Sequence, residues 1–294
     1  MKKDNRISKL IISDMTKHLG KIILSLALII ILIPFDTFAQ GGLLITPRRV
    51  IFNGKKNTIN VNLANSGQDT STYLISFVQY RMRADGGFDQ ITEPDSGQYF
   101  ADKYIRLYPR KVTLPPGTNQ VVKLQLRGYK KLKDGEYRSH LIFKLKNDLT
   151  ALGMEDENKD TTTISIRLVP VFGISIPAII RKGKSTTQVS LSDIAVNMVN
   201  DTTPSLNITF NRTGNFSVYG DITVDYISPD LEEPVQVGVV RGLAVYTPNK
   251  LRHFTLTLDN NYNYNKGKLR VVYKSKSDLN KTVTLAEKEL TLEN

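Results

Sequence analysis

Residues 119–126 have the sequence NQVVKLQL, and this stretch decides the fold class of the chain. Its apolar residues alternate with polar ones at the two-residue period of a strand that buries one face. Residues 57–63, NTINVNL, repeat the pattern. The turn sequence Pro115-Pro116-Gly117 comes just before the first stretch. Together these features predict antiparallel strands joined by tight turns.

Strand periodicity extends over most of residues 43–180, interrupted by turn sequences such as Asn53-Gly54. Seven strands in roughly 140 residues are typical of an immunoglobulin-like β-sandwich. The acidic stretch 147–160 is expected to be an exposed loop before the seventh strand. Besides the two stretches above, strands are predicted at 43–52, 72–82, 103–114, 136–146 and 161–180.

A second series of strands follows the basic segment 181–184, RKGK. A length of 294 residues also favours about two domains. The prediction is therefore an all-β chain with two immunoglobulin-like β-sandwich domains in tandem, residues 41–180 and 181–294, and no helix longer than about two turns. The strands expected in the second domain are 186–198, 205–211, 217–227, 235–246, 251–258, 267–274 and 282–292.

Residues 1–40 have the pattern of a secretory signal peptide. Basic residues precede the apolar run Ile22–Ile33, Pro34 ends it, and small residues at Thr37 and Ala39 suit a cleavage site next to Gln40. An N-terminal membrane anchor is the alternative, but this run is shorter than the roughly 20 residues that span a bilayer. We expect export through the inner membrane, followed by cleavage.

The composition argues against most enzyme classes. The chain has no Cys, which excludes disulfides, thiolate zinc sites and thiol nucleophiles. His18, His140 and His253 are its only histidines. Ser139 precedes His140 on a predicted strand, so their side chains point to opposite faces and cannot form a nucleophile–base pair. We predict a protein that is not an enzyme and that binds no metal and no cofactor.

The net charge of +12 favours acidic partners or anionic surfaces. Nucleic acid is not an expected partner, because the basic residues are dispersed singly and no aromatic RNA-binding signature accompanies them. The segment NNYNYN at 260–265 is similar to a sugar-binding loop, although an Asn-rich hairpin tip is the favoured interpretation.

Three segments resemble the periplasmic pilus-assembly chaperones, the PapD-like family. In the first, an arginine stands just before an apolar triplet and a turn; the second has an R-x-x-P-x-x-x-x-L-x-P-G pattern; the third has an acidic-Gly-acidic turn before a Tyr and an Arg. The resemblance covers residues 43–180, and in 181–294 it rests on size, strand number and residues 211–216. The three segments are ITPRRVIFNG at 45–54, RLYPRKVTLPPG at 106–117 and DGEYRSHLIF at 134–143.

The resemblance implies assembly rather than catalysis. A chaperone of this family lends its seventh strand to a pilin-like subunit that lacks its own last strand, and basic residues in a cleft hold the subunit's terminal carboxylate. The implied partners are pilin-like or other surface-structure subunits in the periplasm. An outer-membrane usher and a self-capping dimer of the free chaperone remain open.

Arg49 matches the cleft arginine of the family, because it directly precedes the apolar triplet Val50-Ile51-Phe52. A guanidinium suits this role because its planar fork pairs both carboxylate oxygens. Arg48 would lie on the opposite face of the strand. The alternative is that both arginines are solvated charges of an edge strand.

Ile164, Ile166 and Leu168 match the alternating residues of the donated strand, although ordinary core-facing alternation would look the same. The resemblance also implies a cleft lysine, but Phe172-Gly173 stands at that place. Arg167 is the nearest basic substitute on the strand. The chain is therefore a divergent match.

A second function remains open from the sequence. A structural or adhesive cell-surface protein made of immunoglobulin-like modules would share the fold. Such proteins more often contain repeated modules or a C-terminal sorting segment, and the sequence shows neither.

Overall fold

The computed structural model describes residues 42–146, 173–200, 202–276 and 282–293. The predicted signal peptide, the predicted acidic loop and the first part of the predicted seventh strand lie outside these residues. Leu43–Asn294 forms one compact unit. Within the described ranges, no helix has the length and apolar character that crossing a membrane requires.

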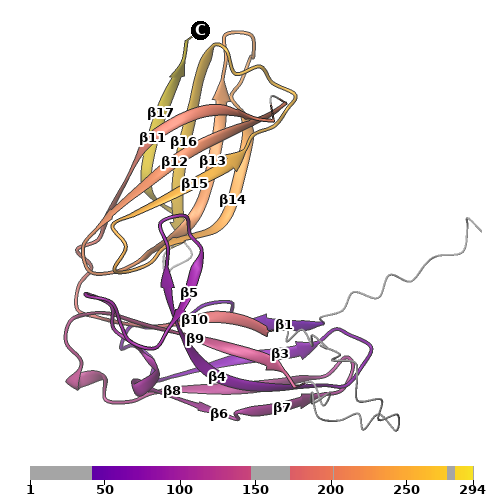
Figure 1. Cartoon of the computed structure of the whole chain (residues 1–294), viewed down its shortest axis with the longest axis vertical. Coiled ribbons are helices and arrows are strands. Elements are labelled where there is room, and N and C mark those ends of the chain that lie inside the picture. Colours follow the sequence, from indigo (N-terminus) through magenta and orange to yellow (C-terminus); the bar gives the residue numbers. More distant parts are fainter. Residues whose placement is uncertain (1–41, 147–172, 201, 277–281, 294) are drawn as a thin grey trace, which may run out of the picture. The chain divides into compact units, whose positions relative to one another are not determined.

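The first β-sandwich packs two sheets face to face (Figure 1). One sheet has the strand order β1-β3-β8-β6, and the other has the order β2-β10-β9-β4-β5, with β7 also paired to β4. The strands are β1 (Leu43–Thr46), β2 (Val50–Phe52), β3 (Thr58–Asn65), β4 (Ser71–Met82), β5 (Phe88–Ile91), β6 (Ile105–Tyr108), β7 (Lys111–Leu114), β8 (Asn119–Leu126), β9 (Gly135–Leu145) and β10 (Gly173–Lys182).

The predicted first strand, 43–52, is two strands that belong to different sheets. β1 pairs antiparallel with β3, whereas β2 pairs in parallel with β10. Pro47 lies in the bend between them, and a proline cannot donate a backbone hydrogen bond to a ladder. The predicted strand 103–114 divides in the same way at Pro109, into β6 and β7.

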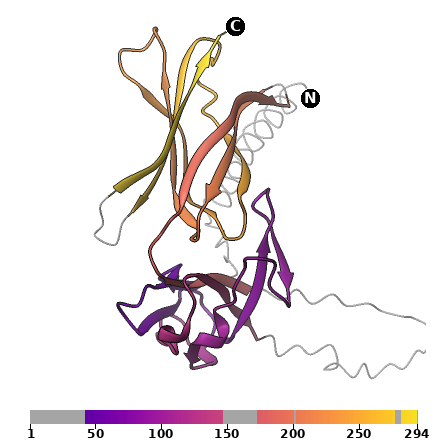
Figure 2. The same ribbon diagram turned by 90° about the vertical axis from the view of Figure 1, so that its left-hand side faces the viewer.

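One strand was not predicted. β5 forms a hairpin with β4 across the turn at residues 83–87, where the sequence predicted only a turn. The hairpin reaches the second sandwich (Figure 2): His253 N donates to Ala84 O at 2.7 Å, and Asn249 Nδ2 donates to Met82 O at 2.8 Å. The helical elements in the described part of the chain are the short 3-10 turns η1 (Asp102–Tyr104) and η2 (Tyr129–Lys131).

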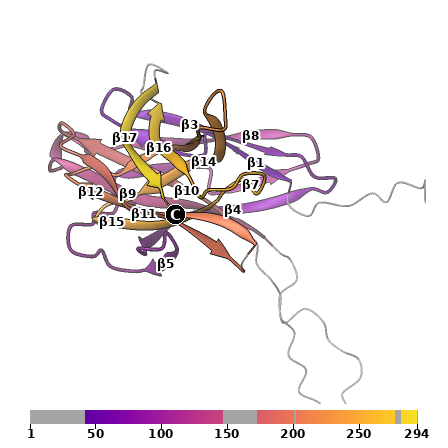
Figure 3. The same ribbon diagram turned by 90° about the horizontal axis from the view of Figure 1, so that it is seen from above.

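The second β-sandwich confirms the seven strands that the sequence predicted there. Its sheets have the orders β11-β12-β15 and β14-β13-β16-β17. The edge strands β11 and β17 of the two sheets pack against each other (Figure 3). The strands are β11 (Gln188–Val199), β12 (Thr203–Thr213), β13 (Val218–Ile227), β14 (Val235–Val245), β15 (Leu251–Thr257), β16 (Gly267–Lys276) and β17 (Thr282–Leu292).

Each sandwich encloses its own apolar core, so the all-β prediction with two tandem β-sandwiches is confirmed. The alternating residues of 119–126 and 57–63 lie in the first core, where Val122, Leu124, Val61 and Leu63 have no exposed area. Burying an aliphatic side chain of this size contributes about 1.5–3 kcal/mol. A smaller cluster joins residues of both sandwiches, namely Met82, Ile179, Ala244 and Tyr246, with Ile51 packed against it.

Candidate functional site

Arg49 lies in the bend between β1 and β2, where the chain changes from one sheet to the other. Its side chain is held by two tyrosines of the second sandwich. Nη1 of Arg49 donates to Tyr246 Oη at 3.2 Å. Its guanidinium carbon lies 4.6 Å from the ring centroid of Tyr219 and 5.4 Å from that of Tyr246. Arg49 is therefore not the freely solvated edge-strand charge that the alternative interpretation allowed.

The opposite edge of the same guanidinium is unused. Nε and Nη2 of Arg49 are buried, and neither has a hydrogen-bond partner among the residues that the structure describes. These two nitrogens form the side of the fork that pairs a carboxylate through two parallel hydrogen bonds. Arg49 therefore has two adjacent donors on one edge, the arrangement that a carboxylate could pair with.

Arg49 also lines a groove of about 780 Å³. The first sandwich contributes Ile51 and Arg181 to its walls, and the second contributes Tyr219 and Ser217. A chain end that entered this groove would meet residues of both sandwiches. Residues of both sandwiches therefore line the groove beside Arg49.

Arg181, the other arginine of the groove, already has a carboxylate partner. Its Nε donates to Glu136 Oε2 at 2.9 Å, and its Nη2 donates to Ser217 O at 2.6 Å. The Glu136 side chain has no exposed area and also accepts from Ser217 N at 3.0 Å and from Ser217 Oγ. Because its charge is compensated, Arg181 fixes the two sandwiches together and leaves Arg49 as the candidate receptor.

Arg138 lies behind Tyr246 and was not predicted as a site residue. It is only 2 % exposed, and its guanidinium carbon lies 4.3 Å from the centroid of the Tyr246 ring. Its Nη2 donates to Thr247 O at 3.2 Å, while Nε and Nη1 are buried without a partner in the described ranges. Burial lowers the pKa of Arg138, since the charged form loses hydration. Positive charge thus exceeds negative charge around Tyr246.

His140 is buried among aromatic rings beside Arg138. Burial, with smaller contributions from Arg138 and Arg49, lowers its pKa to about 3, so the imidazole is neutral near pH 7. The ring packs edge-on against Tyr80 and Tyr246. Ser139 Oγ instead accepts from the backbone N–H groups of residues 101 and 102. The expectation that Ser139 and His140 form no catalytic pair is consistent with these contacts.

β10 has a free edge in the first sandwich. β9 pairs with β10 from Gly173 to Lys182, whereas β2 pairs only with Ala178–Ile180. Residues 173–177 therefore have one edge without a strand partner in the described part of the chain. Ile174 is 43 % exposed, but Ile176, two residues later on the same face, is 3 % exposed and belongs to the core.

The predicted donor residues lie outside the described residues. These are Ile164, Ile166 and Leu168, and the predicted substitute cation Arg167 lies there with them. Arg48 is described: it is exposed, whereas its neighbour Arg49 is half-buried. The two neighbouring arginines therefore differ in burial, which is the difference expected of residues on opposite faces of a strand.

Sequence analysis missed Tyr219, Tyr246 and Arg138. The two tyrosines are far from Arg49 in the sequence and reach it only because the second sandwich packs there. Arg138 stood within a quoted motif, but its need for specific partners follows from the burial of both faces of β9 over residues 135–141, which only the structure shows.

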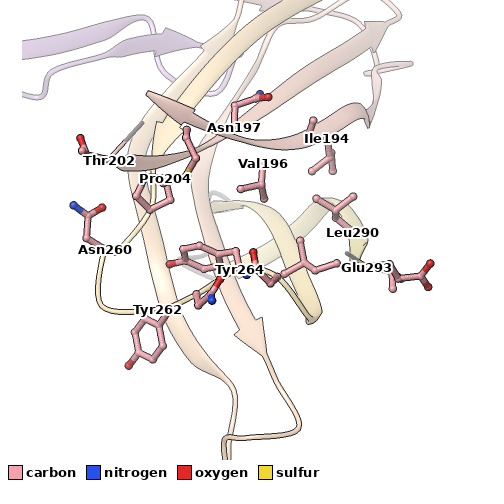
Figure 4. A pocket seen from close by; sticks show the side chains of 16 residues that line it. Ile194, Val196, Asn197, Thr202, Pro204, Asn260, Tyr262, Tyr264, Leu290 and Glu293 are labelled. Carbon is pink, nitrogen blue, oxygen red and sulfur yellow. The ribbon is translucent and has the colours of Figure 1, made fainter. Parts of the chain in front are cut away.

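A second groove of about 570 Å³ lies in the second sandwich, beside the segment 260–265 (Figure 4). Figure 4 shows Tyr264 inside this groove near Val196 and Leu290, whereas Tyr262 points away. The segment is held through its backbone, because Tyr226 Oη donates to Asn263 O and Tyr264 Oη donates to Asp259 O. It connects β15 to β16, which belong to different sheets, so it is a connection between the sheets and the favoured interpretation as a hairpin tip is wrong.

No metal centre is formed by the described residues, since they contain no group of three or more His, Asp or Glu side chains suited to hold an ion.

Neither a protein-family model nor a curated protein sequence matches the chain.

Solved structures do match it. The YadV chaperone is 12% identical, with a TM-score of 0.43, and the match covers 86% of this chain and 100% of that one. The class 5 fimbriae chaperone CfaA is 16% identical, with a TM-score of 0.39 over 86% of this chain and 99% of that one. The E. coli chaperone DraB is 12% identical, with a TM-score of 0.42 over 85% and 96%.

Proposed function

We propose that the chain is a periplasmic chaperone that binds and caps pilus, fimbrial or similar surface-structure subunits by donating a strand to them. The observation that carries this proposal is the unpaired Nε–Nη2 edge of Arg49 in a groove lined by both sandwiches. A buried guanidinium edge without a partner costs free energy, and a terminal carboxylate would supply two charge-assisted hydrogen bonds.

The free edge of β10 supports the second half of the proposal. An extended partner strand could pair with residues 173–177 through main-chain hydrogen bonds, as in β-augmentation. Ile164, Ile166 and Leu168 have the same parity as Ile174 and Ile176. Ile164, Ile166 and Leu168 would be the three side chains that enter the subunit. Burying three aliphatic side chains would contribute about 1.5–3 kcal/mol each.

The remaining features of the proposal come from the sequence. Residues 1–40 would direct export and be removed, residues 41–180 and 181–294 would be the two domains, and the protein would act without a cofactor, a metal or catalysis. An outer-membrane usher and a self-capping dimer of the free protein are the two further partners that the resemblance allows.

The test is co-purification of secreted subunits from the periplasm with tagged variants. The full-length chain is expressed together with whichever secreted proteins are encoded next to its gene. Arg49→Ala should cost roughly 2–5 kcal/mol of binding, as the loss of one member of a buried charge pair does. Arg49→Lys should restore only part of the loss, because an ammonium cannot make the bidentate contact.

Arg48→Ala is the matched control, since Arg48 is the exposed neighbour, and it should retain the subunit yield of the wild type. Thermal melts of each variant separate binding from folding. Equal yields from Arg49→Ala and the wild type would refute the carboxylate role. A chain that captures no adjacent subunit in any form would instead favour the structural or adhesive surface protein.

A further inference from the structure

We propose that Tyr219, Tyr246 and Arg138 are positioning residues that hold Arg49 so that only its Nε–Nη2 edge remains for a ligand, which makes the site selective for a carboxylate. The inference rests on the proposed function and extends it to the second sandwich. Four side chains form a series in which cations and rings alternate, in the order Tyr219, Arg49, Tyr246, Arg138.

The first contact places the guanidinium plane. Tyr219 lies on β13 with its ring centroid 4.6 Å from the guanidinium carbon of Arg49. A cation attracted to the face of a ring keeps the edges of its guanidinium plane available for hydrogen bonds. Tyr219 itself is fixed by Gly242, where a Cβ would lie only 2.7 Å from the tyrosine hydroxyl oxygen. Tyr219 therefore restrains the orientation of Arg49 and leaves its fork usable.

The second contact decides which edge is used. Tyr246 Oη accepts from Nη1 of Arg49, so the Nη1 end of the fork is occupied. Nε and Nη2 remain, both buried and both unpaired within the described residues. A ligand that satisfies both must offer two acceptors in one plane at the spacing of a carboxylate. A primary amide offers only one, because its nitrogen is a donor.

The third contact fixes Tyr246. Arg138 packs 4.3 Å from the centre of the Tyr246 ring and donates to the carbonyl oxygen of Thr247, the next residue. The charge of Glu136 attracts the Arg138 guanidinium and that of Arg49 repels it, so Arg138 is a second positive charge that acts on Arg49. A negatively charged ligand would lower the repulsion between the two arginines. Arg138 thus acts through Tyr246 and through its charge.

The experiment uses acetate as the probe and acetamide as its neutral counterpart. The Nε–H signal of Arg49 is followed by NMR in the 15N-labelled full chain without its signal peptide, and Arg49→Lys identifies the signal by its loss. We expect acetate to shift this signal in a saturable way and acetamide to leave it unchanged. Tyr219→Leu should weaken acetate binding about three- to tenfold, and Tyr219→Phe, which keeps the ring, should restore it.

Tyr246→Phe is the second variant, and it removes only the acceptor of Nη1. With Nη1 free, acetate should bind across the two terminal nitrogens as well, so the shift of the Nε–H signal at saturation should fall. Backbone amide spectra of each variant show whether the fold is retained. If Tyr219→Leu unfolds, Tyr246→Phe and Arg138→Lys carry the test. Arg138→Lys should weaken acetate binding because a lysine has no planar guanidinium to stack on the Tyr246 ring.

The outcomes separate this inference from the proposed function. Acetate binding at Arg49 that is unchanged in Tyr219→Leu, Tyr246→Phe and Arg138→Lys would overturn the positioning role and leave the carboxylate site standing. An Arg49 signal that responds equally to acetate and acetamide would overturn the selectivity. The absence of any response in the wild type would overturn the carboxylate site itself, whatever the tyrosines do.

Discussion

Removing the carboxylate of Glu136 should strongly destabilise the protein. Glu136 is fully buried and accepts hydrogen bonds from Arg181 and Ser217, which belong to different sandwiches. Glu136→Ala would leave the Ser217 N–H group buried and unpaired, which costs about 1–3 kcal/mol. It would also remove one member of a buried ion pair, which costs about 3–5 kcal/mol. The Arg181 side chain is 24% exposed and can regain some hydration, so the two costs overlap and we expect a loss of about 3–5 kcal/mol.

The measurement is urea unfolding followed by far-UV circular dichroism and by tyrosine fluorescence, which suits a chain with no Trp. Because Glu136 connects the two sandwiches, the variant should also show two separate transitions. Asp230→Ala is the control: its ion pair with Lys266 is exposed on both sides, so its loss should change the stability far less than the loss of the buried pair. The reasoning is refuted if Glu136→Ala costs no more than Asp230→Ala.

Two further predictions concern pH and the donor strand. The pKa of His140 is about 3 in the folded protein and near 6.5 when unfolded, so the unfolded state binds the extra proton. Stability should therefore fall as the pH drops from about 6.5 towards 3, and His140→Phe should remove about 2 kcal/mol of the loss between pH 7.5 and 5, measured by urea unfolding against the wild type. Ile164→Ser with Ile166→Ser should leave the melting temperature of the free protein unchanged but abolish subunit capture. Ile176→Ser, a core residue of the same parity, should instead unfold the protein or cost several kcal/mol, and an equal melting temperature for both would contradict the division between donor and core residues.

Alternation was sufficient to predict most of the fold. In β8 and β3 the apolar residues of every second position are the ones buried in the core, because these strands have one covered face and one solvated face. The two-residue period did not predict a strand where no face of the strand is fully covered. β5 has the sequence FDQI and no fully buried residue, so its pairing with β4 leaves little trace in the sequence.

The change of sheet between β1 and β2 was also missed, although Pro47 marked the place. A proline interrupts a ladder, but the sequence does not say whether the chain resumes in the same sheet or crosses to the other one. The chain crosses to the other sheet because Val50–Phe52 pairs with an edge of β10, a strand more than 100 residues later in the sequence. The bend that results is what brings Arg49 out of both ladders and towards the second sandwich.

The candidate site was predictable only from the side of the first sandwich. Arg49 was found because a local motif surrounds it, whereas Tyr219 and Tyr246 carry no motif and become relevant through tertiary packing alone. The same packing explains the burial of Arg138. The second sandwich covers the outer face of β9, so both faces of the strand are buried and water does not solvate the Arg138 guanidinium. The outer face of β9 carries Glu136 as well as Arg138, and Glu136 attracts Arg138. Even so, Arg138 and the neighbouring Arg49 each keep two buried nitrogens without a partner among the described residues, which is costly for the free protein. That cost makes sense if a ligand with a negative charge completes the site, and it gives the second sandwich a part in binding that its own sequence does not reveal.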